Sequence, residues 1–236
     1  MQVERDPDLP WVAALSGRSE TAAARAVDEA AGELRLFRHL DREHRREGRQ
    51  SYIEIDAPLE LHALARLLRP QHVVEVGVSS GVSSAYFLNA LALNGRGTLH
   101  SVDLPSRPRA GGKVSRESWS LPPGRGSGWA VPFPLRPRWD LRLGDKRAVI
   151  PLLARELPRV DLVLYDVPHN ESDLDREFRE LDPRVSSGSV VIVDHGPSGG
   201  LCAALRRWAG RRDATPLGRR GLGLYGMRCG PRLGVR

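Results

Sequence analysis

From residue 72 onward the chain alternates short β-branched runs with stretches of helical periodicity, and this alternation restricts the fold more than any other feature. The run HVVEV at residues 72–76 is followed by a Gly/Ser turn and a helical pattern over residues 84–93. Four more strand candidates occupy residues 97–102, 139–143, 160–165 and 189–193, with helical patterns at residues 147–156 and 172–181. Strands that alternate with helices form right-handed βαβ units, which predicts a largely parallel sheet.

The two ends of the chain have a different texture. Residues 19–49 are rich in Ala, Glu and Arg, with Leu34, Phe37 and Leu40 at helical spacing, so we expect one long amphipathic helix there. A shorter helix is expected over Pro58–Leu68. After a helical pattern at residues 201–208, two short strand candidates flank the turn-like sequence GRRG, which predicts an antiparallel hairpin.

Together these patterns predict an α/β fold. We expect a Rossmann-like, seven-stranded, mostly parallel and doubly wound sheet that closes with the C-terminal antiparallel hairpin. Residues 1–54 form an N-terminal helical extension in this prediction, and residues 55–236 form the main domain. Residues 104–138 interrupt the alternation with seven prolines and five glycines. Such a long irregular stretch in a compact domain is either a functional lid or a disordered insert.

Composition excludes several classes of protein. No run of 18 apolar residues is present, so no membrane-spanning segment is expected. The N-terminal residues MQVERDPDLP are polar and acidic, unlike a signal peptide. Two cysteines cannot form a disulfide framework, and they fit a cytoplasmic location.

The net charge of +7 is unevenly distributed. Residues 104–142 carry a net +6 and residues 206–236 a net +8, whereas the rest of the chain is acidic. Of the 36 basic residues 34 are arginine, a usage that codon composition can produce without any function. A polynucleotide partner is therefore not the first choice, and a weaker hypothesis is that the insert attracts an anionic small molecule.

The most specific local motif is EVGVSSGVSS at residues 75–84, directly after a strand and at the start of a helix. Gly77 permits a tight turn, Gly81 permits close approach of a ligand, and the helix N-terminus offers unpaired N–H groups. The motif lacks the glycine spacing of a dinucleotide site and the Lys-Ser/Thr ending of a phosphate loop. Glu75 would repel a pyrophosphate but would suit the amine-bearing end of S-adenosylmethionine.

Polar or acidic residues also follow the other strand candidates. In open α/β sheets ligands bind at the carboxyl ends of the strands, and an acid after the second strand can accept both hydroxyls of a ribose. The second strand ends with Asp103, and the third is followed by Gly144 and Asp145. The fourth is followed by Asp166 and, three residues later, His169, and the fifth by Asp194 and His195.

On these motifs, with the stretches LVLYDVPHNESDLDREFREL and VVIVDH, the chain resembles the class I S-adenosylmethionine-dependent methyltransferases. More narrowly, it resembles the metal-dependent O-methyltransferases of small molecules, of the catechol and macrocin types. The resemblance covers about residues 55–225. It implies donor binding by Glu75, Gly77, Gly81, Ser83, Asp103, Gly144, Asp145 and Asp166.

The resemblance also implies a reacting centre. Asp166, Asp194 and His195 would hold a divalent metal, most simply Mg²⁺, and His169 would be the catalytic base. The family usually has Asn or Asp where this chain has His195, and here Val167 and Pro168 separate Asp166 from His169. The acceptor would be a hydroxylated small molecule such as a natural-product sugar or a phenol, and the enzyme could be a homo-oligomer.

Two other functions stay open at this point. A nucleic-acid methyltransferase could use the arginine-rich insert and tail for phosphates, although the stretch from Asp166 to His169 lacks the aromatic residue of base-amine methyltransferases. A non-catalytic member of the fold could bind a partner through the same basic segments, and it would not bind the methyl donor.

Overall fold

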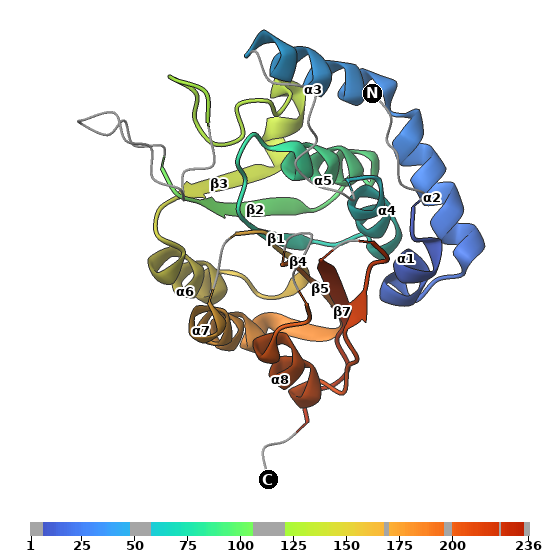
Figure 1. Cartoon of the computed structure of the whole chain (residues 1–236), viewed down its shortest axis with the longest axis vertical. Coiled ribbons are helices and arrows are strands. Elements are labelled where there is room, and N and C mark those ends of the chain that lie inside the picture. Colours follow the sequence, from blue (N-terminus) through green and yellow to red (C-terminus); the bar gives the residue numbers. More distant parts are fainter. Residues whose placement is uncertain are drawn as a thin grey trace.

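The computed structural model describes residues 7–47, 58–105, 121–167, 170–195, 200–221 and 223–233. Within these ranges the strands form one seven-stranded sheet in the order β3-β2-β1-β4-β5-β7-β6 (Figure 1). The strands are β1 His72–Val76, β2 Thr98–Asp103, β3 Trp139–Leu143, β4 Val160–Tyr165, β5 Val185–Asp194, β6 Leu217–Gly218 and β7 Leu224–Arg228. β1 to β5 are parallel, and β7 is antiparallel to β5 and β6. The predicted fold class is confirmed.

The order of the strands reverses between β1 and β4. From β1 the chain proceeds outward to β2 and β3, and it then returns to the other side of β1 to place β4 and β5. The carboxyl ends of β1 and β4 therefore lie at a topological switch point, which is where open α/β sheets bind their ligands.

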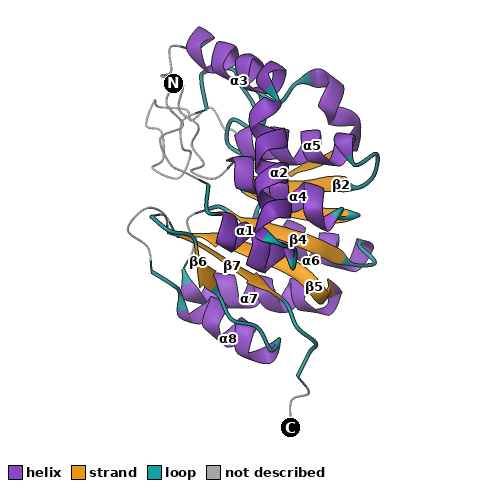
Figure 2. Ribbon diagram, turned by 90° about the vertical axis from the view of Figure 1, so that its right-hand side faces the viewer, coloured by secondary structure: helices purple, strands orange, loops and turns teal. Residues whose placement is uncertain are grey.

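Helices cover both faces of the sheet, so that the molecule has three layers (Figure 2). One core contains buried residues of α1, α2, α4 and α5, and the other contains buried residues of α6, α7 and α8. The helices are α1 Leu9–Ser16, α2 Glu20–Gly32, α3 Leu34–Arg46, α4 Pro58–Leu68, α5 Val82–Leu93, α6 Lys146–Glu156, α7 Glu171–Leu181 and α8 Ala203–Arg211. Short 3₁₀ helices, η1 Phe133–Arg138 and η2 Asp182–Arg184, precede β3 and β5.

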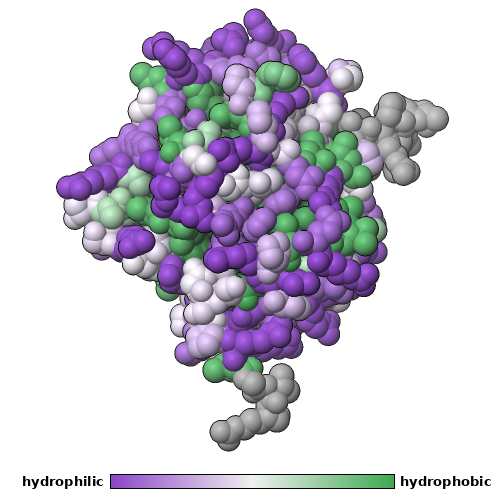
Figure 3. Space-filling model, turned by 180° about the vertical axis from the view of Figure 1, so that it is seen from behind, coloured by the Kyte–Doolittle hydropathy of each residue, from purple (hydrophilic) through white to green (hydrophobic). Residues whose placement is uncertain are grey.

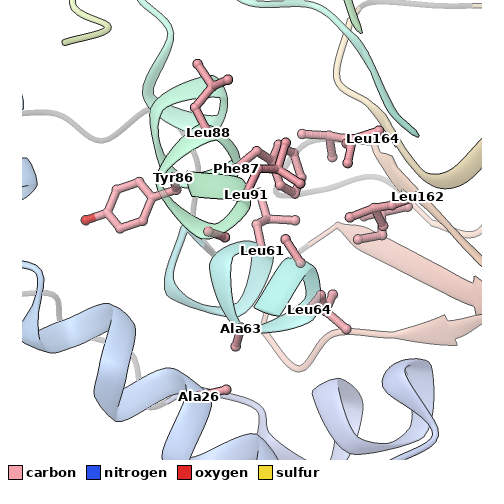
Figure 4. Close-up of a cluster of buried hydrophobic side chains, with 14 of the residues drawn as sticks. Ala26, Leu61, Ala63, Leu64, Tyr86, Phe87, Leu88, Leu91, Leu162 and Leu164 are labelled. Carbon is pink, nitrogen blue, oxygen red and sulfur yellow. The ribbon is translucent and has the colours of Figure 1, made fainter. Parts of the chain in front are cut away.

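The two cores follow from the alternation of side chains along each strand. In β4, Leu162 and Leu164 face the core beneath α4 and α5, whereas Val163 and Tyr165 face the core beneath α6 to α8. Figure 4 shows the first of these cores, in which leucines of α4 and α5 lie against Leu162 and Leu164. Burial on both faces explains why the strands are continuous apolar runs.

The prediction of one long helix over residues 19–49 is wrong. The chain leaves helical geometry at Glu33 (φ −75°, ψ 54°), and α2 and α3 meet there at a bend visible at the upper right of Figure 1. α2 buries small residues, Ala23, Ala26 and Ala30 among them, and packs against α4. α3 contacts a different segment, through a ring contact of His44 with Trp129, so one straight helix could not serve both surfaces. The preceding helix α1 was not predicted.

The described part of the insert lies between β2 and β3 in the chain, as predicted. Residues 121–138 form turns that end in η1, and η1 packs against α5. Residues 106–120 of the predicted lid lie outside the described residues. None of the helices in the described part of the chain has the length and apolar character that crossing a membrane requires.

Candidate donor site at the carboxyl ends of the strands

The strand register brings the predicted site residues into one row. Val76 of β1 pairs with Val102 of β2 on one side and with Tyr165 of β4 on the other, and Tyr165 pairs with Val193 of β5. The residues that follow these positions are therefore neighbours at one edge of the sheet, with adjacent strands about 4.8 Å apart. They are, in spatial order, Asp103, Gly77, Asp166 and Asp194, and Leu143, the residue before Gly144, lies beyond Asp103.

Gly77 is required at its position. Its φ is +99°, and a Cβ atom there would lie 1.9 Å from the carbonyl oxygen of Asp166. The backbone N–H of Gly77 donates to the carbonyl of Val102 (2.9 Å), and the N–H of Asp166 donates to the carbonyl of Val76 (2.8 Å). The backbones of β1, β2 and β4 thus stay in close contact beyond the ends of the strands.

Gly81 is the N-cap residue of α5 and is equally constrained. It has a φ of +90°, and a Cβ atom would lie 2.5 Å from Cγ2 of Val131 and 2.8 Å from Cα of Gly128. Both contacts come from the insert. The loop of residues 77–81, called the glycine loop below, is therefore covered by the insert on one side.

Glu75 is completely buried, and its carboxylate is surrounded by three serine hydroxyl groups. Ser83 donates to Oε1 (2.5 Å), and Ser84 and Ser101 donate to Oε2 (2.6 Å each). Desolvation by burial raises the pKa of Glu75 to about 6, although the three hydrogen bonds favour the charged form. In this structure the side chains of Glu75 and Ser83, both predicted to bind the donor, hydrogen-bond to each other.

Asp103 lies beside the glycine loop. Its Oδ2 accepts a hydrogen bond from the backbone N–H of Ser79 (3.2 Å), and its carbonyl accepts one from the N–H of Gly144 (2.9 Å). Asp103 thus connects three segments: its carboxylate bonds to the loop after β1, and its backbone carbonyl bonds to the residue after β3. The side chain of Asp145 caps α6 by accepting a hydrogen bond from the N–H of Arg147 (2.8 Å).

Asp166 and Asp194 directly follow Tyr165 and Val193, which pair on the neighbouring strands β4 and β5. His195 comes next, its backbone N–H donates to the carbonyl of Gly223 (3.0 Å), and its ring centroid lies 5.8 Å from that of Tyr225. Among the described residues, however, no group of three or more His, Cys, Asp or Glu side chains is arranged to hold a metal ion. The predicted base His169 lies outside the described residues.

Several residues near the site were missed by sequence reasoning. Ser101 donates to Glu75, and the indole N–H of Trp139 donates to Oγ of Ser101 (2.8 Å). Backbone hydrogen bonds from Gly128 to Ser79 (2.8 Å) and from Ala130 to Ser80 (3.0 Å) join the insert to the glycine loop. Nothing in the local sequence marks these partners, because the bonds connect segments far apart in the chain.

The basic C-terminal segment is largely engaged in contacts within the protein. Arg219 pairs with buried Glu60, Arg220 with Asp8, and both Arg212 and Arg232 with Asp182. Arg228 donates to the carbonyls of Leu15 and Ser16. Hydrophilic residues and smaller apolar patches are interspersed over the face shown in Figure 3. The arginines of this segment therefore connect the C-terminal part of the chain to α1, α4 and η2.

The sheet order, the glycine loop at the switch point and the acid after β2 define the class I methyltransferase architecture. A family model described as "Methyltransferase domain" matches residues 74–195, slightly more than half of the chain. The chain belongs to this family, and the match spans the segment from β1 to the end of β5. A search of curated proteins found no significant match.

Similar solved structures support the same architecture. The chain superposes with a TM-score of 0.53 on the O-methyltransferase TomG of Streptomyces achromogenes, solved with S-adenosylmethionine, at 22% identity over 83% of this chain and 89% of that one. A methyltransferase from Geobacter sulfurreducens gives 0.53 at 16% identity over 84% and 88%. An O-methyltransferase from Bacillus cereus, solved with S-adenosylhomocysteine, gives 0.51 at 14% identity over 97% and 99%. Similarities at this identity establish the shared fold.

Proposed function

We propose that this protein is an S-adenosylmethionine-dependent O-methyltransferase that acts on a small hydroxylated acceptor. The observation that carries the proposal is the row of Asp103, Gly77, Asp166 and Asp194 at the carboxyl ends of four adjacent strands. It provides a glycine loop for close approach of a ligand, an acid placed for ribose hydroxyls, and two carboxylates beside them. TomG and the Bacillus cereus enzyme were solved with this donor or its product, which supports the same donor here.

In this proposal the donor lies across the ends of β1, β2 and β3. The glycine loop from Gly77 to Gly81 and the first turn of α5, with Ser83, receive the methionine part. Asp103 accepts hydrogen bonds from the ribose hydroxyls, and Gly144 and Asp145 border the adenine. The sulfonium then points toward Asp166, where the acceptor enters.

The reaction is an in-line displacement. The acceptor oxygen attacks the methyl carbon, the carbon–sulfur bond breaks, and S-adenosylhomocysteine leaves with the bonding electron pair. The hydroxyl proton must pass to a base, and His169, three residues after Asp166, has the right chemistry at neutral pH. The residues of this chain thus have to align two molecules and accept one proton.

Metal assistance is the finer part of the proposal. Asp166 and Asp194 provide the hard oxygen ligands that Mg²⁺ prefers, and such an ion would lower the pKa of the acceptor hydroxyl. The described residues do not assemble a third ligand with them, His195 included. No step above therefore depends on the ion. Turnover measured with and without a chelator tests whether the reaction requires it.

The two other functions are less well supported. A polynucleotide would need free arginines, yet Arg212, Arg219 and Arg232 are paired with acids within the protein. A non-catalytic role has no use for the row of Asp103, Asp166 and Asp194 at the ends of adjacent strands. The expected cytoplasmic location rests on cysteine usage alone, and a homo-oligomer remains a prediction from the amphipathic N-terminal segment.

Two measurements test the proposed function. Titration calorimetry with S-adenosylhomocysteine should show binding, and its absence at millimolar ligand would contradict the donor site. A screen of sugars, phenols and their phosphorylated or carboxylated analogues with labelled donor, with and without Mg²⁺, should then identify the acceptor class. Methylation of a tRNA or rRNA pool, with salt-sensitive RNA binding in a gel shift, would favour the nucleic-acid function instead.

A further inference from the structure

Trp139, at the start of β3, contacts two residues, Ser101 and Gly128, that lie on opposite sides of the glycine loop. Its indole N–H donates to Ser101 (2.8 Å), and Ser101 in turn donates to Glu75 (2.6 Å). The edge of its ring lies against Gly128, where a Cβ atom would be only 2.0 Å from Cη2 of the indole. A tryptophan in this position therefore joins the floor of the loop to the segment that covers it.

The first route runs beneath the loop. The Glu75 carboxylate that Ser101 reaches also accepts hydrogen bonds from Ser83 and Ser84, which form the first turn of α5. Glu75, Ser84 and Ser101 are all completely buried, so water cannot replace a lost partner. Ser101 donates its one hydroxyl hydrogen to Glu75, so the Ser101 oxygen can only accept further hydrogen bonds. The indole N–H donates to this oxygen and thereby fixes the orientation of the Ser101 hydroxyl.

The second route runs over the loop. Gly128 has a φ of +69° and donates its N–H to the carbonyl of Ser79. The N–H of Ser79 bonds to the carboxylate of Asp103, the residue placed for the ribose. Contact of the indole with Gly128 thus fixes the position of the insert relative to the glycine loop.

We propose that Trp139 is a positioning residue for the methyl donor, holding the glycine loop and the start of α5 in their binding geometry through Ser101 and Glu75 from below and Gly128 from above. This inference rests on the proposed function, since the ligand of the loop is the donor. Trp139 itself touches neither the donor nor the acceptor in this scheme.

The test compares two tryptophans, of which only Trp139 has a hydrogen-bonded indole N–H in the described part of the chain. Trp139→Phe keeps an aromatic ring but removes both the N–H that bonds to Ser101 and the ring edge that lies against Gly128. Trp129→Phe makes the same chemical change at a buried indole nitrogen that has no hydrogen-bond partner among the described residues. Affinity for S-adenosylhomocysteine is measured by calorimetry for both variants and the wild type, well below their unfolding temperatures.

We expect Trp139→Phe to weaken binding about five- to tenfold, as for loss of one buried hydrogen bond, and Trp129→Phe to stay within about twofold of the wild type. Ser101→Ala should weaken binding to a similar extent. In the double variant the combined loss should be smaller than the sum of the two single losses, because both substitutions remove the bond between Trp139 and Ser101.

Other outcomes overturn the inference. If Trp139→Phe binds like the wild type while both tryptophan variants lose similar stability, Trp139 only packs. Additive losses in the double variant would show that Trp139 does not act through Ser101. If the wild type itself fails to bind, the proposed function falls and this inference falls with it. Should Trp139→Phe not fold, Ser101→Ala binding like the wild type rejects the proposal on its own.

Discussion

Arg219 and Glu60 form an ion pair inside the molecule, with 3.0 Å between Nε and Oε1 and with side chains that are only 4% and 2% exposed. Glu60 also accepts a hydrogen bond from the backbone N–H of Asp8 (2.6 Å). Burial raises the pKa of Glu60, although the hydrogen bond from the backbone N–H of Asp8 and the charge of Arg219 oppose this effect. The pair connects the turn after β6 with α4 and with the residue that caps α1.

This pair should matter for stability because a buried charge cannot be left alone. Arg219→Ala should lower the free energy of unfolding by about 3 to 5 kcal/mol, since Glu60 would remain buried without its cation. The exposed pair of Arg45 with Asp41 is the control, and Arg45→Ala should cost less than about 1 kcal/mol. Urea denaturation of both variants checks the difference, and equal losses would contradict it.

Glu75 should make stability depend on pH in an unusual direction. Its pKa is raised from 4.5 to about 6, so the folded protein takes up this proton before the unfolded chain does. The cost of the buried charge is fully present above pH 6, declines as the pH falls and is gone below pH 4.5, which makes its contribution more favourable in acid.

Comparison with Glu75→Gln isolates this group from the other titrating residues. Between pH 7 and pH 4.5 the wild type should gain about 2 kcal/mol of unfolding free energy relative to the variant. Denaturation curves at several pH values measure it. A difference that stays constant with pH, or that changes in the opposite direction, would show that Glu75 is not held in this environment.

Gly77 should tolerate no side chain. A Cβ atom would meet the Asp166 carbonyl at 1.9 Å, so Gly77→Ala must separate β1 from β4 at the switch point. Gly95 is the matched control, because it also has a positive φ (+68°) but has no atom within 4 Å of a Cβ position. We expect Gly95→Ala to cost about 1 to 2 kcal/mol and to retain donor binding, and Gly77→Ala to lose donor binding in calorimetry. Normal binding by Gly77→Ala would remove the loop from the donor site.

The roles assigned to His169, Asp166 and Asp194 can be separated. His169→Ala should reduce turnover at least about 100-fold while leaving affinity for S-adenosylhomocysteine nearly unchanged, because a base acts on the acceptor. A loss of donor affinity would show that the role of His169 is wrongly assigned. Asp175→Ala, in a carboxylate of α7 that pairs with Arg207, provides the control for general effects of mutation.

The metal is tested by the two aspartates together. If Asp166 and Asp194 hold a divalent ion, replacing either with alanine should reduce turnover as much as EDTA reduces it in the wild type, and added Mg²⁺ should restore only the wild type. Full activity of the wild type in EDTA would exclude the metal, whatever the two variants do.

Local patterns in the sequence were sufficient to predict the sheet and the row of residues at the carboxyl ends of its strands. The predicted bounds of β1, β3 and β4 agree with the structure, because short β-branched runs buried on both faces leave few alternative conformations. Parallel strands place all their carboxyl ends on one edge, so Asp103, Asp166 and Asp194 follow once the strands are known.

Only the tertiary structure decided how those residues are used. Glu75 was predicted to bind the donor, but Ser101 and Ser83 meet its carboxylate. The basic C-terminal segment left a nucleic-acid partner open as an alternative, yet Arg219 finds Glu60 159 positions away in the chain. The bend at Glu33 likewise depends on what each half of the N-terminal segment contacts. Periodicity and turn chemistry act over a few residues and can be read from the sequence, whereas the partner of a buried polar group is set by packing between distant segments.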